Sequence, residues 1–267
     1  MKAKVEIEGL KLEVDFSKGQ DISIPLIFNG SQPNTYNVNK ATSQAYTDDQ
    51  FIGDTRKDGP CNFETYSLTP HCNGTHTECI GHITKERVDI LSSLKDLMIP
   101  SHLISITPVS SKEKYNPELN EGDLLITKEE LIKKLNNVPK KLLEGLIIRT
   151  LPNDKNKKSQ DYMKVKPPFF SIDAMQYIKD IGVKHLLVDT PSVDRLFDDG
   201  ILSAHNIFWD TTDKEYNPIS KNKTITEMIF VDDNIPDGNY LLTIQIPAFV
   251  SDAAPSRPII LLSLIHI

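Results

Sequence analysis

Apolar and polar residues alternate along the first part of the chain, with the period expected of a β-strand that buries one face. Residues 3–8 and 10–16 predict two short strands, and Gly9 between them predicts a hairpin. The same alternation predicts a strand over 101–109. Further strands are predicted over 143–150, 185–188 and 241–247.

Two segments carry the signals of a helix start. Thr127 and Glu130 form a capping box and predict a helix that runs to about Leu135. Ser171 is the predicted cap of a second helix, which ends at Gly182. The elements therefore run as strands, then helices mixed with strands, then strands again.

Residues 29–62 are rich in Gly, Pro, Asn, Asp and Thr and show little periodicity, so they predict long loops. Such loops often shape a substrate entrance. The aromatic residues available to line it are Phe28, Tyr36, Tyr46 and Phe51, and ordinary packing is the alternative for each of them.

Composition narrows the function classes. The 267 residues are 39% apolar, which supports a substantial core, and the net charge of −7 argues against a nucleic-acid partner. No apolar run approaches the roughly 18 residues of a membrane span, and the N-terminus lacks the apolar core of a signal peptide. Three cysteines do not make a disulfide framework. We expect a soluble, cytoplasmic protein with no membrane partner.

The densest chemistry lies in residues 71–82, which hold three of the seven histidines, two cysteines and a glutamate. Imidazole, carboxylate and thiolate are the ligands that transition metals accept. On a strand His76 and Glu78 point to the same face, and His82 lies an even number of residues further on. Spacing alone leaves a metal site and a structural polar cluster as equal alternatives.

The segment Gly74-Thr75-His76-Thr77-Glu78, followed by His82, resembles the H-x-G-T-H-x-D-x-P-x-H signature of the cyclase family of metal-dependent hydrolases, which includes bacterial kynurenine formamidases and isatin hydrolases. Glu78 stands where Asp is usual, and Ile80 where Pro is usual. Cys72 occupies the position of the first histidine, and His71 lies one residue earlier. Either His71 or Cys72 is therefore the candidate first ligand.

Later segments match further motifs of this family in the same order. The turn over 188–194 resembles G-x-D-x-x-S-x-D, with Asp189, Ser192 and Asp194 in place, and His205 follows as the expected metal-binding histidine. The family's bridging glutamate, which precedes an apolar strand, corresponds to Glu227 before residues 228–231. An inserted polar loop over 209–223 separates the two, and residues 251–257 resemble the family's tail.

The resemblance implies a mixed α/β fold of the swivelling β/β/α type, with a mixed sheet and a single domain over residues 1–267. It implies two divalent metal ions per chain, zinc or manganese. His76 and Glu78, with His71 or Cys72, would hold one ion. Glu78, His205 and Glu227 would hold the other.

The resemblance also implies an activity. His82 corresponds to the acid–base residue, and Asp189, Ser192 and Asp194 are expected to orient ligands or form the turn. The substrate would be a small amide, such as an N-aryl formamide of the N-formylkynurenine type. The reaction would then belong to tryptophan catabolism. The protein would be a homo-oligomer, a dimer or tetramer.

Two alternatives remain from the sequence. One is a binding or regulatory protein on the same scaffold with an altered metal site. The other is a Cys–His nucleophile, which no other feature supports, because alternation places Cys79 on the opposite face from Glu78 as a buried thiol.

Overall fold

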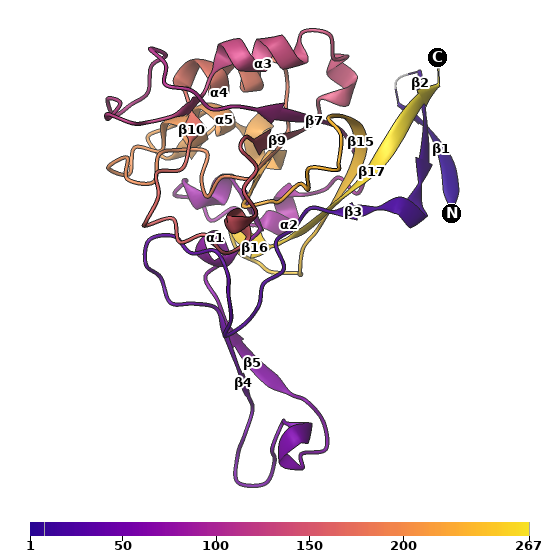
Figure 1. Cartoon of the computed structure of the whole chain (residues 1–267), viewed down its shortest axis with the longest axis vertical. Coiled ribbons are helices and arrows are strands. Elements are labelled where there is room, and N and C mark those ends of the chain that lie inside the picture. Colours follow the sequence, from indigo (N-terminus) through magenta and orange to yellow (C-terminus); the bar gives the residue numbers. More distant parts are fainter. Residues whose placement is uncertain (8, 267) are drawn as a thin grey trace.

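A mixed β-sheet forms the centre of the molecule in the computed structural model, which describes residues 1–7 and 9–266 (Figure 1). Within these residues the sheet has eleven strands. They are β1 (Lys2–Ile7), β2 (Leu10–Asp15), β3 (Gln20–Asp21), β6 (His76–Cys79), β7 (Ile99–Ile106), β9 (Gly145–Thr150), β11 (His185–Val188), β14 (Thr224–Glu227), β15 (Gly238–Gln245), β16 (Ala253–Pro255) and β17 (Arg257–His266).

The order of the strands across the sheet is β1-β2-β17-β15-β7-β9-β11-β14-β6-β16, with β3 also paired to β17. β7, β9, β11 and β14 are mutually parallel. The strands on either side of them run antiparallel, including β6 against β14 and β16 against β6. The end of β14 and the beginning of β6 therefore meet at one edge of the sheet.

Both faces of the sheet are buried at its central parallel strands β9, β11 and β14, as is usual for parallel strands. In β9, Leu146 and Ile148 pack into the larger apolar core cluster, whereas Ile147 points into the cluster on the other face. Helices α3 (Lys128–Leu135), α4 (Ile172–Asp180) and α5 (Ser203–Trp209) cover one face, seen at the top of Figure 1. The short helix α2 (Ile90–Ser93) lies beside β6 and packs into the larger core cluster through Ile90, whereas α1 (Pro70–Asn73) lies beside β16.

The predicted mixed α/β class is confirmed, and so are several predicted elements. The first two strands form a hairpin whose turn includes Gly9, at a φ of +80°. The side chain of Thr127 caps α3 by accepting a hydrogen bond from the Glu130 backbone, and Ser171 caps α4 in the same way. Among the described residues, no helix has both the length and the apolar content needed to cross a membrane.

The prediction of loops throughout residues 29–62 is wrong in one part. β4 (Thr42–Ala45) and β5 (Glu64–Ser67) pair as a hairpin that projects far from the body, at the bottom of Figure 1. The rings of Tyr46, Phe51 and Phe63 pack together on this arm, with centroids 5.2–6.3 Å apart. Tyr46 and Phe51 therefore do not line an entrance in the body of their own chain.

Smaller paired segments complete the fold. β8 (Leu125–Ile126) pairs with β10 (Phe169–Phe170) beside the helices. The predicted polar loop over 209–223 contains the hairpin β12 (Thr211–Thr212) and β13 (Glu215–Tyr216). Its first residue, Trp209, is fully buried, and the indole Nε1 donates to the carbonyl of Lys223.

Candidate metal centre

The centre of the site is built by the ladder between β6 and β14. His76, the first residue of β6, pairs with Glu227, the last residue of β14, and Glu78 pairs with Ile225. Because side chains alternate along a strand, His76 and Glu78 project to the same side, as the sequence predicts. His205 reaches this side from α5, and its Nε2 lies 3.0 Å from Oε1 of Glu78.

The side chains of His76, Glu78, His205 and Glu227 are almost completely buried. The Nε2 of His76 lies 3.5 Å from Oε2 of Glu227, and the Nε2 of His205 lies 3.8 Å from Oε1 of Glu227. Two carboxylates and two imidazoles thus converge in a water-poor interior. Buried carboxylates require a compensating positive charge.

Two further histidines form the partly exposed rim of the site. The Nδ1 of His71 lies 3.0 Å from Oε2 of Glu78, and the Nε2 of His82 lies 3.8 Å from the same oxygen. Ligand atoms of His71, His76 and Glu78 lie within 4.8 Å of one another, and so do those of Glu78, His82 and His205. The structure therefore gathers His71, His76, Glu78, His82, His205 and Glu227 in one place.

In each buried histidine the inner ring nitrogen, Nε2, faces the two carboxylates of the centre, and the outer nitrogen, Nδ1, faces away from them. The hydrogen bonds of the outer nitrogen show whether the inner nitrogen is free to bind a cation. The Nδ1 of His76 donates to the carbonyl of Gly74, and the Nδ1 of His205 donates to Asp194 at 2.6 Å. In a neutral imidazole the other nitrogen, Nε2, then carries a lone pair. In the described part of the chain the buried Nε2 of His76 has no hydrogen-bond partner. An unpaired, buried lone pair beside carboxylates fits a divalent metal ion.

The electrostatics of these side chains also favour a bound cation. Burial lowers the pKa of His205, but hydrogen bonds to Asp194 and Glu78 outweigh it and raise that pKa well above its ordinary value. Burial also lowers the pKa of His71, and its bonds to Asp252 and Glu78 raise it to about 10. Burial raises the pKa of Glu78, but the neighbouring histidines hold it well below the usual range. The carboxylates therefore keep protons on the imidazoles of His71 and His205, and a metal ion could replace those protons.

The turn after β11 supports this centre, as predicted. The backbone N–H of Val193 donates to Oε1 of Glu227, at 2.9 Å. The other oxygen of the Asp194 carboxylate, Oδ1, accepts from the hydroxyl of Tyr115 and from the backbone of Ala204. Asp194 is thus fixed from several sides and fixes the ring of His205.

The other two predicted residues of that turn act further away. Ser192 accepts a hydrogen bond from the backbone of Asp194. The carboxylate of Asp189 bonds to Thr150 and to the Nζ of Lys157. Ser192 therefore shapes the turn, whereas Asp189 ties it to the neighbouring strand β9.

The structure distinguishes the two candidates for the first ligand. His71 faces Glu78 directly, whereas no group of three close ligand side chains among the described residues includes Cys72. The thiol of Cys79 is buried in the larger core cluster and donates to the carbonyl of Val88, which agrees with its predicted structural role. The geometry therefore favours His71.

One predicted element is wrong at Glu227. The strand β14 ends at this residue instead of beginning after it, because Met228 has a φ of +53° and leaves the extended conformation. β14 was missed because Thr224 and Thr226 interrupt its apolar pattern. Both are buried and satisfied by side-chain hydrogen bonds, to His185 and Thr77 respectively.

One residue close to the site had no role assigned from the sequence. The carboxylate of Asp252 contacts the outer nitrogens of both His71 and His82. Asp252 belongs to the 251–257 segment that resembles the family's tail. The motif therefore singles out this stretch of sequence but does not indicate that Asp252 contacts His71 and His82.

A second group of possible ligands, Asp96, Glu144 and His185, lies where β11 begins. Lys184 contacts both carboxylates of this group. The ammonium group already supplies the positive charge there, so the centre around Glu78 is the stronger candidate for a metal.

Comparisons with known proteins identify the family of this chain. The model of the putative cyclase family matches residues 20–195, which is more than half of the chain. No curated protein matches the sequence.

Solved structures are similar to this chain over most of its length. One is a predicted metal-dependent hydrolase from Bacillus stearothermophilus, with 19% identity over 91% of this chain and 98% of that chain and a TM-score of 0.59. Another is an isatin hydrolase bound to the product analogue thioisatinate, with 17% identity, coverage of 92% and 93% and a TM-score of 0.63. A third is isatin hydrolase A from Labrenzia aggregata, with 13% identity, coverage of 92% and 93% and a TM-score of 0.59. At these identities the similarity establishes the fold. With the family match, it shows that the chain belongs to the putative cyclase family.

Proposed function

We propose that this protein is a metal-dependent hydrolase that cleaves a small amide with water. The observation that carries the proposal is the unpaired, buried Nε2 of His76. It lies in a centre that also holds the buried carboxylates of Glu78 and Glu227. Such a set of nitrogen and oxygen donors suits zinc, and manganese is also compatible with it.

The residues divide into two ligand sets that share one carboxylate. His71, His76 and Glu78 would hold one divalent ion. His205 and Glu227 would hold the second, with Glu78 between the two because its two oxygens face His205 and His71 respectively. Paired divalent ions lower the pKa of a coordinated water and polarise a carbonyl oxygen.

We assign proton transfer in this reaction to His82. Its side chain is partly exposed on the rim, and its Nε2 points toward Glu78 at 3.8 Å. The imidazole would accept the proton of the water as the oxygen adds to the amide carbon. It would then return that proton to the nitrogen as the C–N bond breaks. The products are a carboxylic acid and an amine.

We propose an N-aryl formamide such as N-formylkynurenine, a compound of tryptophan catabolism, as the first substrate to test. A cyclic amide is the second. Two of the similar solved structures are described as isatin hydrolases, which supports including isatin itself.

The test is elemental analysis of protein purified without chelator, together with hydrolysis assays on N-formylkynurenine and isatin. About two zinc or manganese ions per chain with turnover of either compound would support the proposal. Two ions without turnover would retain the metal chemistry and reject these substrates. No metal after reconstitution would reject the proposal and favour a binding protein on this scaffold.

We also propose that residues 1–267 act as one domain, because one sheet contains both β1 near the N-terminus and β17 near the C-terminus. The expected homo-oligomer, a dimer or tetramer, stays a prediction. Light scattering on the full chain and on a chain without the arm over 42–67 would test it.

A further inference from the structure

Asp252 lies at the solvent side of the centre and is held there by backbone contacts. It directly precedes β16, whose residue Ala253 pairs with Glu78. The carbonyl of Asp252 accepts from the backbone of Cys79 at 2.9 Å, and the carbonyl of Ser251 accepts from Ile90 at 2.8 Å. The position of the carboxylate is therefore set by the same strand that carries the metal ligands.

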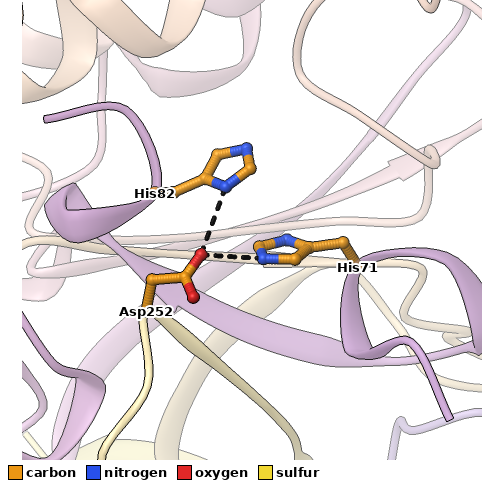
Figure 2. Close-up of side chains that lie close together, drawn as sticks. All are labelled: His71, His82 and Asp252. Atoms are coloured by element: carbon orange, nitrogen blue, oxygen red, sulfur yellow. Dashed lines mark hydrogen bonds and ion pairs between the residues drawn. The ribbon is translucent and has the colours of Figure 1, made fainter. Parts of the chain in front are cut away.

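One oxygen of this carboxylate contacts two histidines at once, as Figure 2 shows. The Nε2 of His71 lies 3.0 Å from Oδ2 of Asp252, and the Nδ1 of His82 lies 3.3 Å from the same atom. The two rings stack with their centroids 4.3 Å apart. Since a carboxylate only accepts hydrogen bonds, each ring nitrogen that faces it carries the proton.

This arrangement decides what the inner nitrogens can do. With Nε2 of His71 protonated, its Nδ1 offers a lone pair toward Glu78 in the neutral ring. With Nδ1 of His82 protonated, its Nε2 is the atom left to accept a proton on the side of Glu78. One carboxylate would therefore set the tautomer of a metal ligand and of the proton-transferring residue together.

The rim histidines need such support more than the buried ones. The side chains of His71 and His82 are 26% and 29% exposed, whereas His76 and His205 are buried. His71 lies on a four-residue helix and His82 on the short 3-10 turn Ile80–His82, so both rings are carried by short elements at the rim of the site. In each buried histidine the outer nitrogen already donates to a fixed oxygen.

We propose that Asp252 is a positioning residue that orients His71 toward the metal and His82 toward the reacting water. This inference rests on the proposed function for its catalytic consequence. The hydrogen bonds themselves do not depend on it. Groups of this kind behind metal-binding histidines typically change metal affinity by about 10–100-fold when removed.

The chain offers matched variants. Asp252→Ala removes the acceptor, whereas Asp252→Asn keeps an oxygen of the same shape that can accept from both rings. Asp96→Ala is the control, because the carboxylate of Asp96 is similarly exposed and also lies 3.0 Å from a histidine, His185, outside the centre.

Three readouts test the proposal. In metal-free protein, NMR should show the Nε2–H proton of His71 and the Nδ1–H proton of His82, which face Asp252. Both signals should be lost in Asp252→Ala and kept in Asp252→Asn. In zinc titrations against a competing chelator, Asp252→Ala should lose about 10–100-fold in affinity for one of the two ions. With N-formylkynurenine or isatin as substrate, its kcat should fall with KM little changed. Asp252→Asn should recover most of the zinc affinity and most of kcat. Asp96→Ala should match the wild type in both quantities.

Two results would overturn the inference, and a third would overturn only the hydrolase proposal. Wild-type zinc affinity and wild-type ring N–H signals in Asp252→Ala would show that the carboxylate orients neither ring. Loss of a whole equivalent of zinc in both Asp252 variants would make Asp252 a ligand instead. If wild-type protein bound no zinc but kept the ring N–H signals, the orientation by Asp252 would stand and the hydrolase proposal would fail.

Discussion

Replacing Glu78 by glutamine tests the core of the proposed centre. Glutamine keeps the shape of the side chain and removes its negative charge. In the metal-free protein, Oε1 of Glu78 faces His205 and Oε2 faces His71, each at 3.0 Å. The variant can accept at only one of these positions, because its other polar atom is an NH2 donor.

The expected loss of stability follows from these contacts. A hydrogen bond to a charged group contributes about 1.5–3 kcal/mol, and removing one partner of a buried ion pair costs about 3–5 kcal/mol. Glu78 is fully buried, so we expect Glu78→Gln to lower the free energy of unfolding by about 3 kcal/mol without metal at pH 7. Zinc at 100 times its Kd would add about 2.7 kcal/mol to the wild type, and much less to a variant that has lost the shared ligand.

Urea unfolding with and without zinc measures both differences. Glu144→Gln is the control, because Glu144 contacts Lys184 at 3.6 Å on the surface, and such pairs contribute at most about 1 kcal/mol. If Glu78→Gln matched the wild type in metal-free stability, or gained as much from zinc, Glu78 would not be the shared carboxylate of the centre.

Four further predictions follow from the same geometry. His71→Ala should lose one zinc ion per chain by elemental analysis while Cys72→Ser keeps both, and the reverse would make Cys72 the first ligand. His82→Asn should keep the zinc but lower kcat by about 10²–10⁴-fold, since general acid–base groups contribute that much, and unchanged turnover would exclude His82 as the base. Raised pKa values leave His71 and His205 protonated at pH 7 without metal. Loading both sites should therefore release about two protons, measured by calorimetry in buffers of different ionisation enthalpy, and no release would contradict the assignment. Because the pKa of His71 rises on folding from 6.5 to about 10, its contribution to metal-free stability is complete below pH 6.5. That contribution should be lost as the pH rises to about 10, and urea unfolding at constant or rising stability over this range would refute it.

Much of the candidate centre could be predicted from local sequence. Alternation along one strand places His76 and Glu78 on the same side whatever the rest of the fold, and the structure has them there. Helix caps at Thr127 and Ser171 are satisfied within a single turn, so their signals needed no tertiary context. The order of the motifs indicated the family, which the comparisons confirm.

Long-range structure decided the rest. Which of His71 and Cys72 lies beside Glu78 depends on which side of α1 faces that carboxylate, and adjacent residues cannot settle that without the packing of the helix. β14 was hidden because buried threonines satisfy their hydroxyl groups with partners distant in the chain.

The kinds of side chain in the centre and the orientation of residues within each short motif follow from local sequence, because strand and helix geometry repeat over a few residues. Only the tertiary structure determined which motifs meet. The β6–β14 ladder places His76 opposite Glu227, and the β6–β16 ladder places Asp252 beside two histidines far away in sequence. Such contacts depend on strand pairing and burial across the whole sheet, which no local pattern of residues encodes.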